Sequence, residues 1–291
     1  MKKIIISSFF AVCVFSFFLT ACDSKTKAID NPVTFNSIQT EEIYHINNDQ
    51  SRLACNLRIS FTFPDSAQDA QTIKTLQAIF VEKVYGDSFS SLSPQKATES
   101  YTQQYIEAFK QFESMIQKEK EEGEKNGYAH KLEDEYIDET GYAYYTWLKD
   151  TVVFNSNNFI SFSVKSLVYE GGAHSSQSIN GYVINLETGK LLQEEDFAGI
   201  HYKNSVSKIL AQKIAKDNDL TNPDDLENLG YNQADEIVPN NNFTIDNKGI
   251  TYYFNENEIA GTVLGLTTVF IPYEEINIYM KKDNPISLLS K

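Results

Sequence analysis

The sequence predicts an α+β fold in which helices pack on antiparallel sheets and the chain divides into two subdomains. Apolar residues alternate with a period of two in several segments and recur at helical spacing in three others. Helical and strand segments also come in separate blocks, which argues against a doubly wound nucleotide-binding fold. With 291 residues, of which 41% are hydrophobic, the chain has enough apolar material for one large core or two smaller cores.

The N-terminus resembles a bacterial lipoprotein signal peptide. Two lysines, Lys2 and Lys3, precede an apolar run that ends in Leu19-Thr20-Ala21-Cys22. This resemblance implies that residues 1–21 are removed and that Cys22 is acylated, which anchors the chain without a membrane-spanning helix. We therefore expect a lipid-anchored protein of the cell envelope, on the periplasmic face of a membrane or at the cell surface. The polar residues 22–40 are predicted to form a flexible tether.

The first folded block is predicted to contain one strand and two helices. Apolar residues alternate from Leu53 to Phe63, and Cys55 lies on the apolar side, which favours a core thiol over a nucleophile. The first helix covers residues 73–84 and is expected to end at Gly86. The second follows Ser93-Pro94, an N-cap and first-turn pair, and places an aromatic stripe toward the core. That stripe consists of Tyr101, Tyr105, Phe109, Phe112 and Ile116.

The second block is predicted to be a meander of antiparallel strands between residues 142 and 192. Strand segments at 144–147, 152–154 and 160–164 are followed by another through residue 186, with turn signals at 155–158 and 187–190. A third helix, over residues 206–214, precedes a polar loop. Further strands are predicted between residues 243 and 254 and at 267–271.

Charge and composition restrict the classes of partner. The formal net charge of −15 argues against nucleic acid and against an anionic membrane surface as binding partners. It favours a basic partner, although an acidic surface also simply keeps an exported protein soluble.

The segment Tyr169-Glu170-Gly171-Gly172-Ala173-His174, with residues 182–190 and 194–197 after it, resembles the extracytoplasmic domain of the RsiV anti-sigma factor. The related families are the domains of unknown function 4163 and 3298. The resemblance continues at residues 253–255, 258–260 and 269–273, so that it covers most of the chain after residue 40. It implies two RsiV-like α+β domains, over residues 41–175 and 176–291, and a non-enzymatic role in binding or sensing.

RsiV-like domains bind lysozyme directly, and the same module occurs beside peptidoglycan deacetylase domains. The resemblance therefore implies a lysozyme-like basic envelope protein as the first candidate ligand and a peptidoglycan or other glycan as the alternative. Where the family has Pro-Tyr pairs, this chain has Glu256-Asn257 and Gly261-Thr262. The candidate ligand-binding residues are Tyr169, Glu170, Gly171, Gly172, His174, Phe254, Asn255 and Glu258.

No motif in the sequence predicts catalysis. The four histidines lack metal-ligand spacing, and neither a nucleophile elbow nor a phosphate-binding loop is present. We therefore predict no enzymatic activity, no cofactor and no metal. A cell-wall hydrolase or deacetylase stays the least favoured alternative, because 40 acidic residues can always supply a carboxylate pair.

Overall fold

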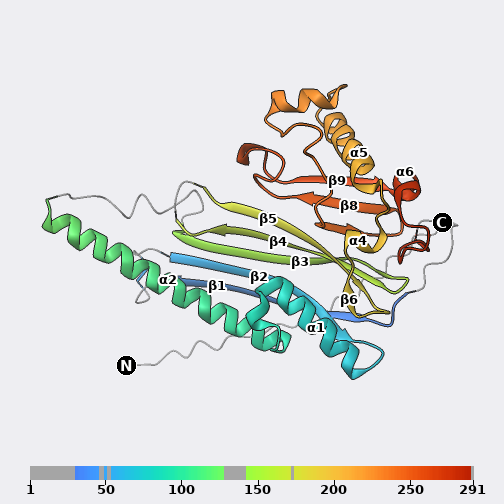
Figure 1. Ribbon diagram of the computed structural model, residues 1–291. Coiled ribbons are helices and arrows are strands. Elements are labelled where there is room, and N and C mark those ends of the chain that lie inside the picture. The colour runs from blue at the N-terminus through green and yellow to red at the C-terminus, as the bar shows by residue number, and fades with distance from the viewer. Residues whose placement is uncertain (1–29, 46–48, 51–53, 128–141, 172–173, 290–291) are drawn as a thin grey trace.

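A computed structural model describes residues 30–45, 49–50, 54–127, 142–171 and 174–289 (Figure 1). The predicted α+β class is confirmed, because helices pack on two sheets that are mainly antiparallel. The larger sheet has six strands in the order β1-β2-β3-β4-β5-β6. These strands are β1 Thr34–His45, β2 Ala54–Ser66, β3 Tyr144–Ser156, β4 Phe159–Tyr169, β5 Ser176–Asn185 and β6 Lys190–Leu191.

One pair of strands in this sheet is parallel. β2 and β3 run in the same direction, with Arg58 in register with Trp147, whereas the predicted sheets were antiparallel throughout. The reason is the connection between them, which consists of α1 Ala70–Tyr85, the short helix η2 Asp87–Phe89 and α2 Pro94–Lys125. A crossover of this length returns the chain to the starting end of the sheet, which a hairpin cannot do.

The end of α1 and the start of α2 are where the sequence predicts, whereas α1 begins at Ala70, three residues before the predicted start. Asp69 caps α1 by accepting hydrogen bonds from the backbone N–H groups of Gln71 and Thr72, each at 2.9 Å. Gly86 ends α1 at a φ of 101°, a conformation that costs glycine little. Ser93 caps α2 and Pro94 occupies its first turn, as predicted.

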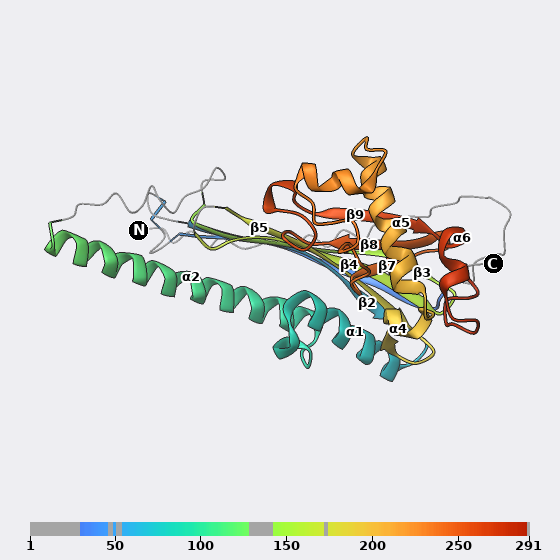
Figure 2. The same cartoon turned by 45° about the horizontal axis from the view of Figure 1, so that its top comes forward.

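α1 and α2 cover one face of the six-stranded sheet (Figure 2). The core between them is rich in aromatic side chains, with the rings of Phe80 and Phe162 stacked at 4.0 Å between centroids. Cys55 is fully buried in this core, and burial raises the pKa of its thiol to about 12. This confirms the prediction of a core thiol.

The hairpin turns follow the sequence signals. Asn157 and Asn158 connect β3 to β4 with φ values of 53° and 65°, and Gly189 lies between β5 and β6 at a φ of 66°. From β3 to β6 the sheet is the predicted antiparallel meander.

The C-terminal part forms a second core around a three-stranded antiparallel sheet of β7 Phe243–Ile245, β8 Gly249–Phe254 and β9 Thr267–Pro272. The third predicted helix is α5 Tyr202–Asp217. Shorter helices complete this part: α4 Glu194–Phe197, η3 Pro223–Leu229, η4 Thr262–Leu264, α6 Tyr273–Ile276 and η5 Asn277–Tyr279. None of the helices formed by the described residues is long and apolar enough to cross a membrane.

The three-stranded sheet packs on the second face of the six-stranded sheet, at one end only (Figure 2). β7 crosses β5 at Gly181, where a Cβ atom would lie 2.5 Å from the backbone carbonyl carbon of Phe243. The side chain of Asn242 accepts a hydrogen bond from Gly181 N–H at 2.7 Å and donates one to the Ile179 carbonyl at 2.9 Å. The Ser161 hydroxyl accepts a hydrogen bond from Ile245 N–H. The remaining part of this face is not covered by the second core.

Two predicted boundaries differ from the structure. Residues 34–40, expected in the flexible tether, form the first part of β1. β1 is an edge strand that pairs with β2 through its backbone, so it needs little of the apolar alternation on which the prediction relied. The boundary at residues 175 and 176 separates β4 from β5, which are neighbours in the same sheet.

Candidate ligand-binding groove

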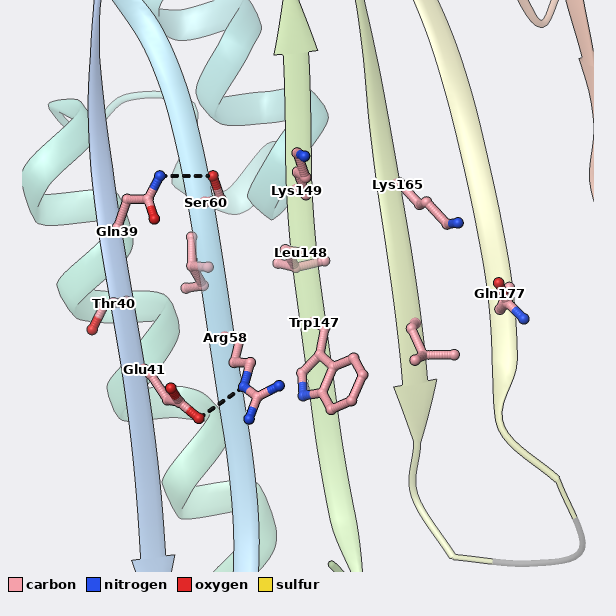
Figure 3. Close-up of a pocket in the computed structure, with 12 residues that line it drawn as sticks. Gln39, Thr40, Glu41, Arg58, Ser60, Trp147, Leu148, Lys149, Lys165 and Gln177 are labelled. Carbon is pink, nitrogen blue, oxygen red and sulfur yellow. Dashed lines mark hydrogen bonds and ion pairs between the residues drawn. The ribbon is translucent and has the colours of Figure 1, made fainter. Parts of the chain in front are cut away.

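The uncovered part of the six-stranded sheet carries a groove of about 570 Å³ across β1 to β5 (Figure 3). Most of its lining comes from side chains that point away from α1 and α2, and Thr40, Ile59 and Leu148 are the exceptions. The lining residues are Gln39, Thr40, Glu41, Arg58, Ile59, Ser60, Trp147, Leu148, Lys149, Lys165, Leu167 and Gln177.

Strand alternation and register bring these side chains together. Along β3, Trp147 and Lys149 point into the groove, whereas Leu148 belongs to the core under α1 and α2. Two neighbouring cross-strand rows result from the pairing. The first row is Glu41, Arg58, Trp147, Leu167 and Gln177, and the second is Gln39, Ser60, Lys149, Lys165 and Ile179.

Trp147 lies at the centre of the first row and is held by its neighbours. Its indole N–H donates to the Asn56 side-chain oxygen at 2.7 Å, and the Arg58 guanidinium carbon lies 4.7 Å from the ring centroid. The stacked ring of Tyr145 lies at 5.2 Å. Figure 3 looks onto the open face of the sheet and shows the ring plane of Trp147 turned toward the viewer.

Glu41 is the single carboxylate among the lining residues. It accepts hydrogen bonds from Arg58 Nε at 2.7 Å and from the Asn56 side chain at 3.0 Å. The hydrogen bonds from Arg58 and then Asn56 hold the pKa of Glu41 below its usual value. Glu41 is therefore ionised at neutral pH and fixes the guanidinium beside the indole.

None of the predicted residues around the β4–β5 hairpin that the structure describes lines this groove, and Tyr169 is tied to it only through Tyr145. Tyr169 is buried and stacks on Tyr145 at 5.4 Å, which extends the aromatic row that starts at Trp147. Glu170 accepts a hydrogen bond from the Tyr144 hydroxyl at 3.0 Å. Gly171 has a φ of 79°, a value that favours glycine, and His174 is exposed. Gly172 lies outside the described residues.

The predicted residues at the end of β8 have partners within the fold. Asn255 accepts a hydrogen bond from Ile179 N–H at 2.7 Å, which joins β8 to β5. Glu258 accepts one from Asn255 N–H at 2.8 Å, and Phe254 is buried in the second core. Asn255 thus joins the two sheets directly and Glu258 holds Asn255, while a ligand-binding role for Phe254, Asn255 and Glu258 stays a prediction.

Sequence reasoning missed four residues of the groove: Arg58, Trp147, Lys149 and Lys165. The available signal was that Trp147 is the only tryptophan of the chain, at the centre of the period-two series Tyr145, Trp147, Lys149. Cys22, the predicted lipidation site, lies outside the described residues. Among the residues that the structure describes, no group of three or more His, Cys, Asp or Glu side chains is arranged to hold a metal ion.

The groove is chemically suited to hold a ring-shaped polar ligand. An indole gives an apolar platform, and amides, a hydroxyl and cations surround it with hydrogen-bond donors. A single carboxylate held by an arginine does not make the acid and base pair of a glycoside hydrolase.

Two family matches divide the chain. Residues 56–177 match the family described as Deacetylase PdaC, and residues 192–274 match the family DUF3298, a protein of unknown function. The groove lies mostly within the first match, and the second core lies within the second. No curated protein matches the sequence.

Solved structures of DUF3298 proteins share the fold. A DUF3298 family member from Bacteroides fragilis is 26% identical, with a TM-score of 0.76, and the match covers 90% of this chain and 99% of that one. A DUF3298 family protein from Pseudomonas aeruginosa is 14% identical, with a TM-score of 0.59, and the match covers 87% of this chain and 96% of that one.

Proposed function

We propose that this chain is a non-enzymatic, extracytoplasmic binding module of the RsiV-like type, and that its groove binds a cell-wall glycan such as peptidoglycan. The observation that carries the proposal is the partly exposed indole of Trp147 among polar side chains on the open face of the sheet. Sugar rings present an apolar face of C–H groups with hydroxyls around it, which matches an aromatic platform with hydrogen-bond donors at its edge.

The fixed position of Trp147 also supports the proposal. The indole is held by Asn56, Arg58 and Tyr145, so little side-chain freedom is lost when a ligand packs against it. Gln39 and Gln177 lie at opposite sides of the groove, on β1 and β5. Their amide groups can donate to and accept from sugar hydroxyls.

A pull-down with purified insoluble peptidoglycan tests the proposal. The protein starts at residue 23, since every described element lies after residue 29, and it is compared with the Trp147→Ala variant. We expect the wild type to sediment with the glycan and the variant to lose at least about 10-fold in affinity, since stacked aromatic contacts are central to such sites. Equal sedimentation of the two proteins would contradict the proposal.

A second candidate, binding of a lysozyme-like basic protein, is favoured by a different surface. Leu229, Val263 and Leu264 are exposed where η3 and η4 meet, and Gly261 N–H donates to the Gly230 carbonyl between them. The acidic residues Asp224, Asp225 and Glu227 lie on η3 beside this apolar cluster. Apolar side chains with a one-signed charged rim are typical of protein interfaces.

Calorimetric titration with a C-type lysozyme at low and moderate salt tests this second candidate. It predicts saturable binding that weakens with salt and that is lost when Glu227 is changed to Lys. A salt-insensitive titration, or one without heat, removes the candidate. A Trp147→Ala control separates the two surfaces, because the groove lies on the six-stranded sheet and the apolar cluster lies on η3 and η4.

Lipid anchoring is the third part of the proposal. If Cys22 carries the lipid, the wild type fractionates with membranes and the Cys22→Ser variant with the soluble envelope proteins. Retention of Cys22→Ser in the membrane fraction would show that the anchor lies elsewhere.

A further inference from the structure

Two lysines lie on neighbouring strands of the groove, and the groove carboxylate Glu41 is paired with Arg58 instead of with them. Lys149 and Lys165 are directly opposite in the β3–β4 register, and both are exposed. Residues in such positions have Cβ atoms about 5 Å apart, and like charges there destabilise a sheet. In the described part of the chain, neither lysine has an acidic ion-pair partner.

The direct cross-strand pairing of two cations, rather than the lack of an acidic partner, distinguishes Lys149 and Lys165 from the other lysines that the structure describes. Lys83, Lys110 and Lys213 form ion pairs with glutamates, whereas most other lysines in the described part of the chain do not. The third cation of the groove, Arg58, is already engaged by Glu41 and by the indole. The two lysines are therefore the cations of the groove that are free to bind an anion.

The neighbours of the lysine pair add donors and no negative charge. Ser60 is in register with Lys149, and its hydroxyl accepts a hydrogen bond from the Gln39 side chain at 3.3 Å, which leaves the hydroxyl proton free to be donated. The row formed by Gln39, Ser60, Lys149 and Lys165 thus presents amide, hydroxyl and ammonium donors in sequence across four strands (Figure 3).

We propose that Lys149 and Lys165 bind a carboxylate of the saccharide that lies on Trp147, which makes an acidic saccharide the ligand class of the groove. This inference rests on the proposed function. Lys149 is two residues from Trp147 along β3, a rise of about 7 Å. That distance matches the separation between the centre of a stacked sugar ring and a carboxylate carried on that sugar or on its neighbour.

Two peptide-free tetrasaccharides of equal length are the probes. One is the neutral N-acetylglucosamine tetramer, and the other alternates N-acetylglucosamine with N-acetylmuramic acid, so that the carboxylate belongs to the sugar. Both are titrated by calorimetry into the chain from residue 23, its Lys149→Gln/Lys165→Gln variant and its Trp147→Ala variant. The matched control is Lys203→Gln/Lys208→Gln, which removes two exposed lysines of α5, outside the groove.

We expect the wild type to bind the acidic tetrasaccharide about 10-fold more tightly than the neutral one at low salt, with the difference shrinking as salt rises. The groove variant should bind both probes equally, and the α5 control should keep the full preference. Because the two glutamines relieve a like-charge pair, the groove variant should unfold at the wild-type temperature or slightly above it.

The outcomes separate the inference from the proposed function. If the wild type binds both probes equally through Trp147, the lysine inference is wrong and the glycan proposal stands. If the acidic probe binds through the lysines but Trp147→Ala has no effect, the glycan platform is wrong and an anion site remains. If neither probe binds, both are wrong.

Discussion

The open face of the six-stranded sheet has two ends that differ in the size of their side chains. Where the three-stranded sheet packs, β4 and β5 present Ser161 and Gly181, which bond with Ile245 of β7 and with Asn242 just before it. Where no described element packs on this face, the same strands present Leu167, Lys165 and Gln177, with Trp147 beside them on β3. Small residues thus mark the end that binds another part of the chain, and large polar and aromatic residues mark the end that is left for a ligand.

Adding one methyl group at the covered end is expected to have the largest effect. Gly181→Ala places a Cβ 2.5 Å from the Phe243 backbone, which must then move. We expect the free energy of unfolding to fall by about 3 kcal/mol, as measured by urea denaturation.

Gly261→Ala is the control, because no atom lies within 4 Å of its new Cβ and its φ of −63° suits any residue. Equal stability of the two variants would show that the sheets do not meet at Gly181.

On the face of the six-stranded sheet that α1 and α2 cover, the comparison concerns a buried charged group. Asp150 follows Lys149 on β3 but points into the core, where Thr62 N–H donates to its Oδ1 at 2.6 Å and its Oδ2 has no hydrogen-bond partner within the described structure. Burial raises the pKa of Asp150 to about 7. Since the native state holds this proton more tightly than the unfolded chain, the Asp150 contribution lowers stability as pH rises from about 4 to about 7.

Asp150→Asn removes this ionisation. As the pH rises from 5 to 8, the free energy of unfolding of wild type should fall by about 2 kcal/mol relative to that of the variant. A stability difference that does not change with pH would place the Asp150 titration outside this range.

Removing a hydroxyl at the covered end should have a smaller effect. Ser161→Ala leaves the buried Ile245 N–H without its acceptor, which costs about 1–2 kcal/mol of unfolding free energy. Ser60→Ala, in the open groove, is the matched control and should change stability by less than about 0.5 kcal/mol. If Ser161→Ala and Ser60→Ala lower the free energy of unfolding by the same amount, the covered and open ends of the sheet do not differ as described.

Much of the fold was predictable from local patterns. The period-two alternation of β2, the caps at Ser93 and Gly86 and the Asn-rich turn at 155–158 each depend on residues close in sequence. The parallel β2–β3 pair and edge strand β1 were not, because they depend on how a long crossover returns and on backbone pairing. The groove has the same origin: Glu41, Arg58 and Trp147 meet only through strand register.

The stability effect at Trp147 would sharpen the comparison most. Trp147 is partly exposed, but its indole N–H donates to the buried Asn56 side chain, so Trp147→Ala should lower the free energy of unfolding by about 1–2 kcal/mol while glycan affinity falls. A loss of several kcal/mol in thermal or urea unfolding would make Trp147 a structural residue.

The most direct test of the account is the fluorescence of Trp147 itself. As the only tryptophan, it reports on the groove alone when it is excited selectively over tyrosine. Titration with the acidic tetrasaccharide should give a saturable change in its emission, with the same affinity as the calorimetric titration. Heat of binding with unchanged emission would show that the ligand binds away from Trp147 and would contradict the central claim.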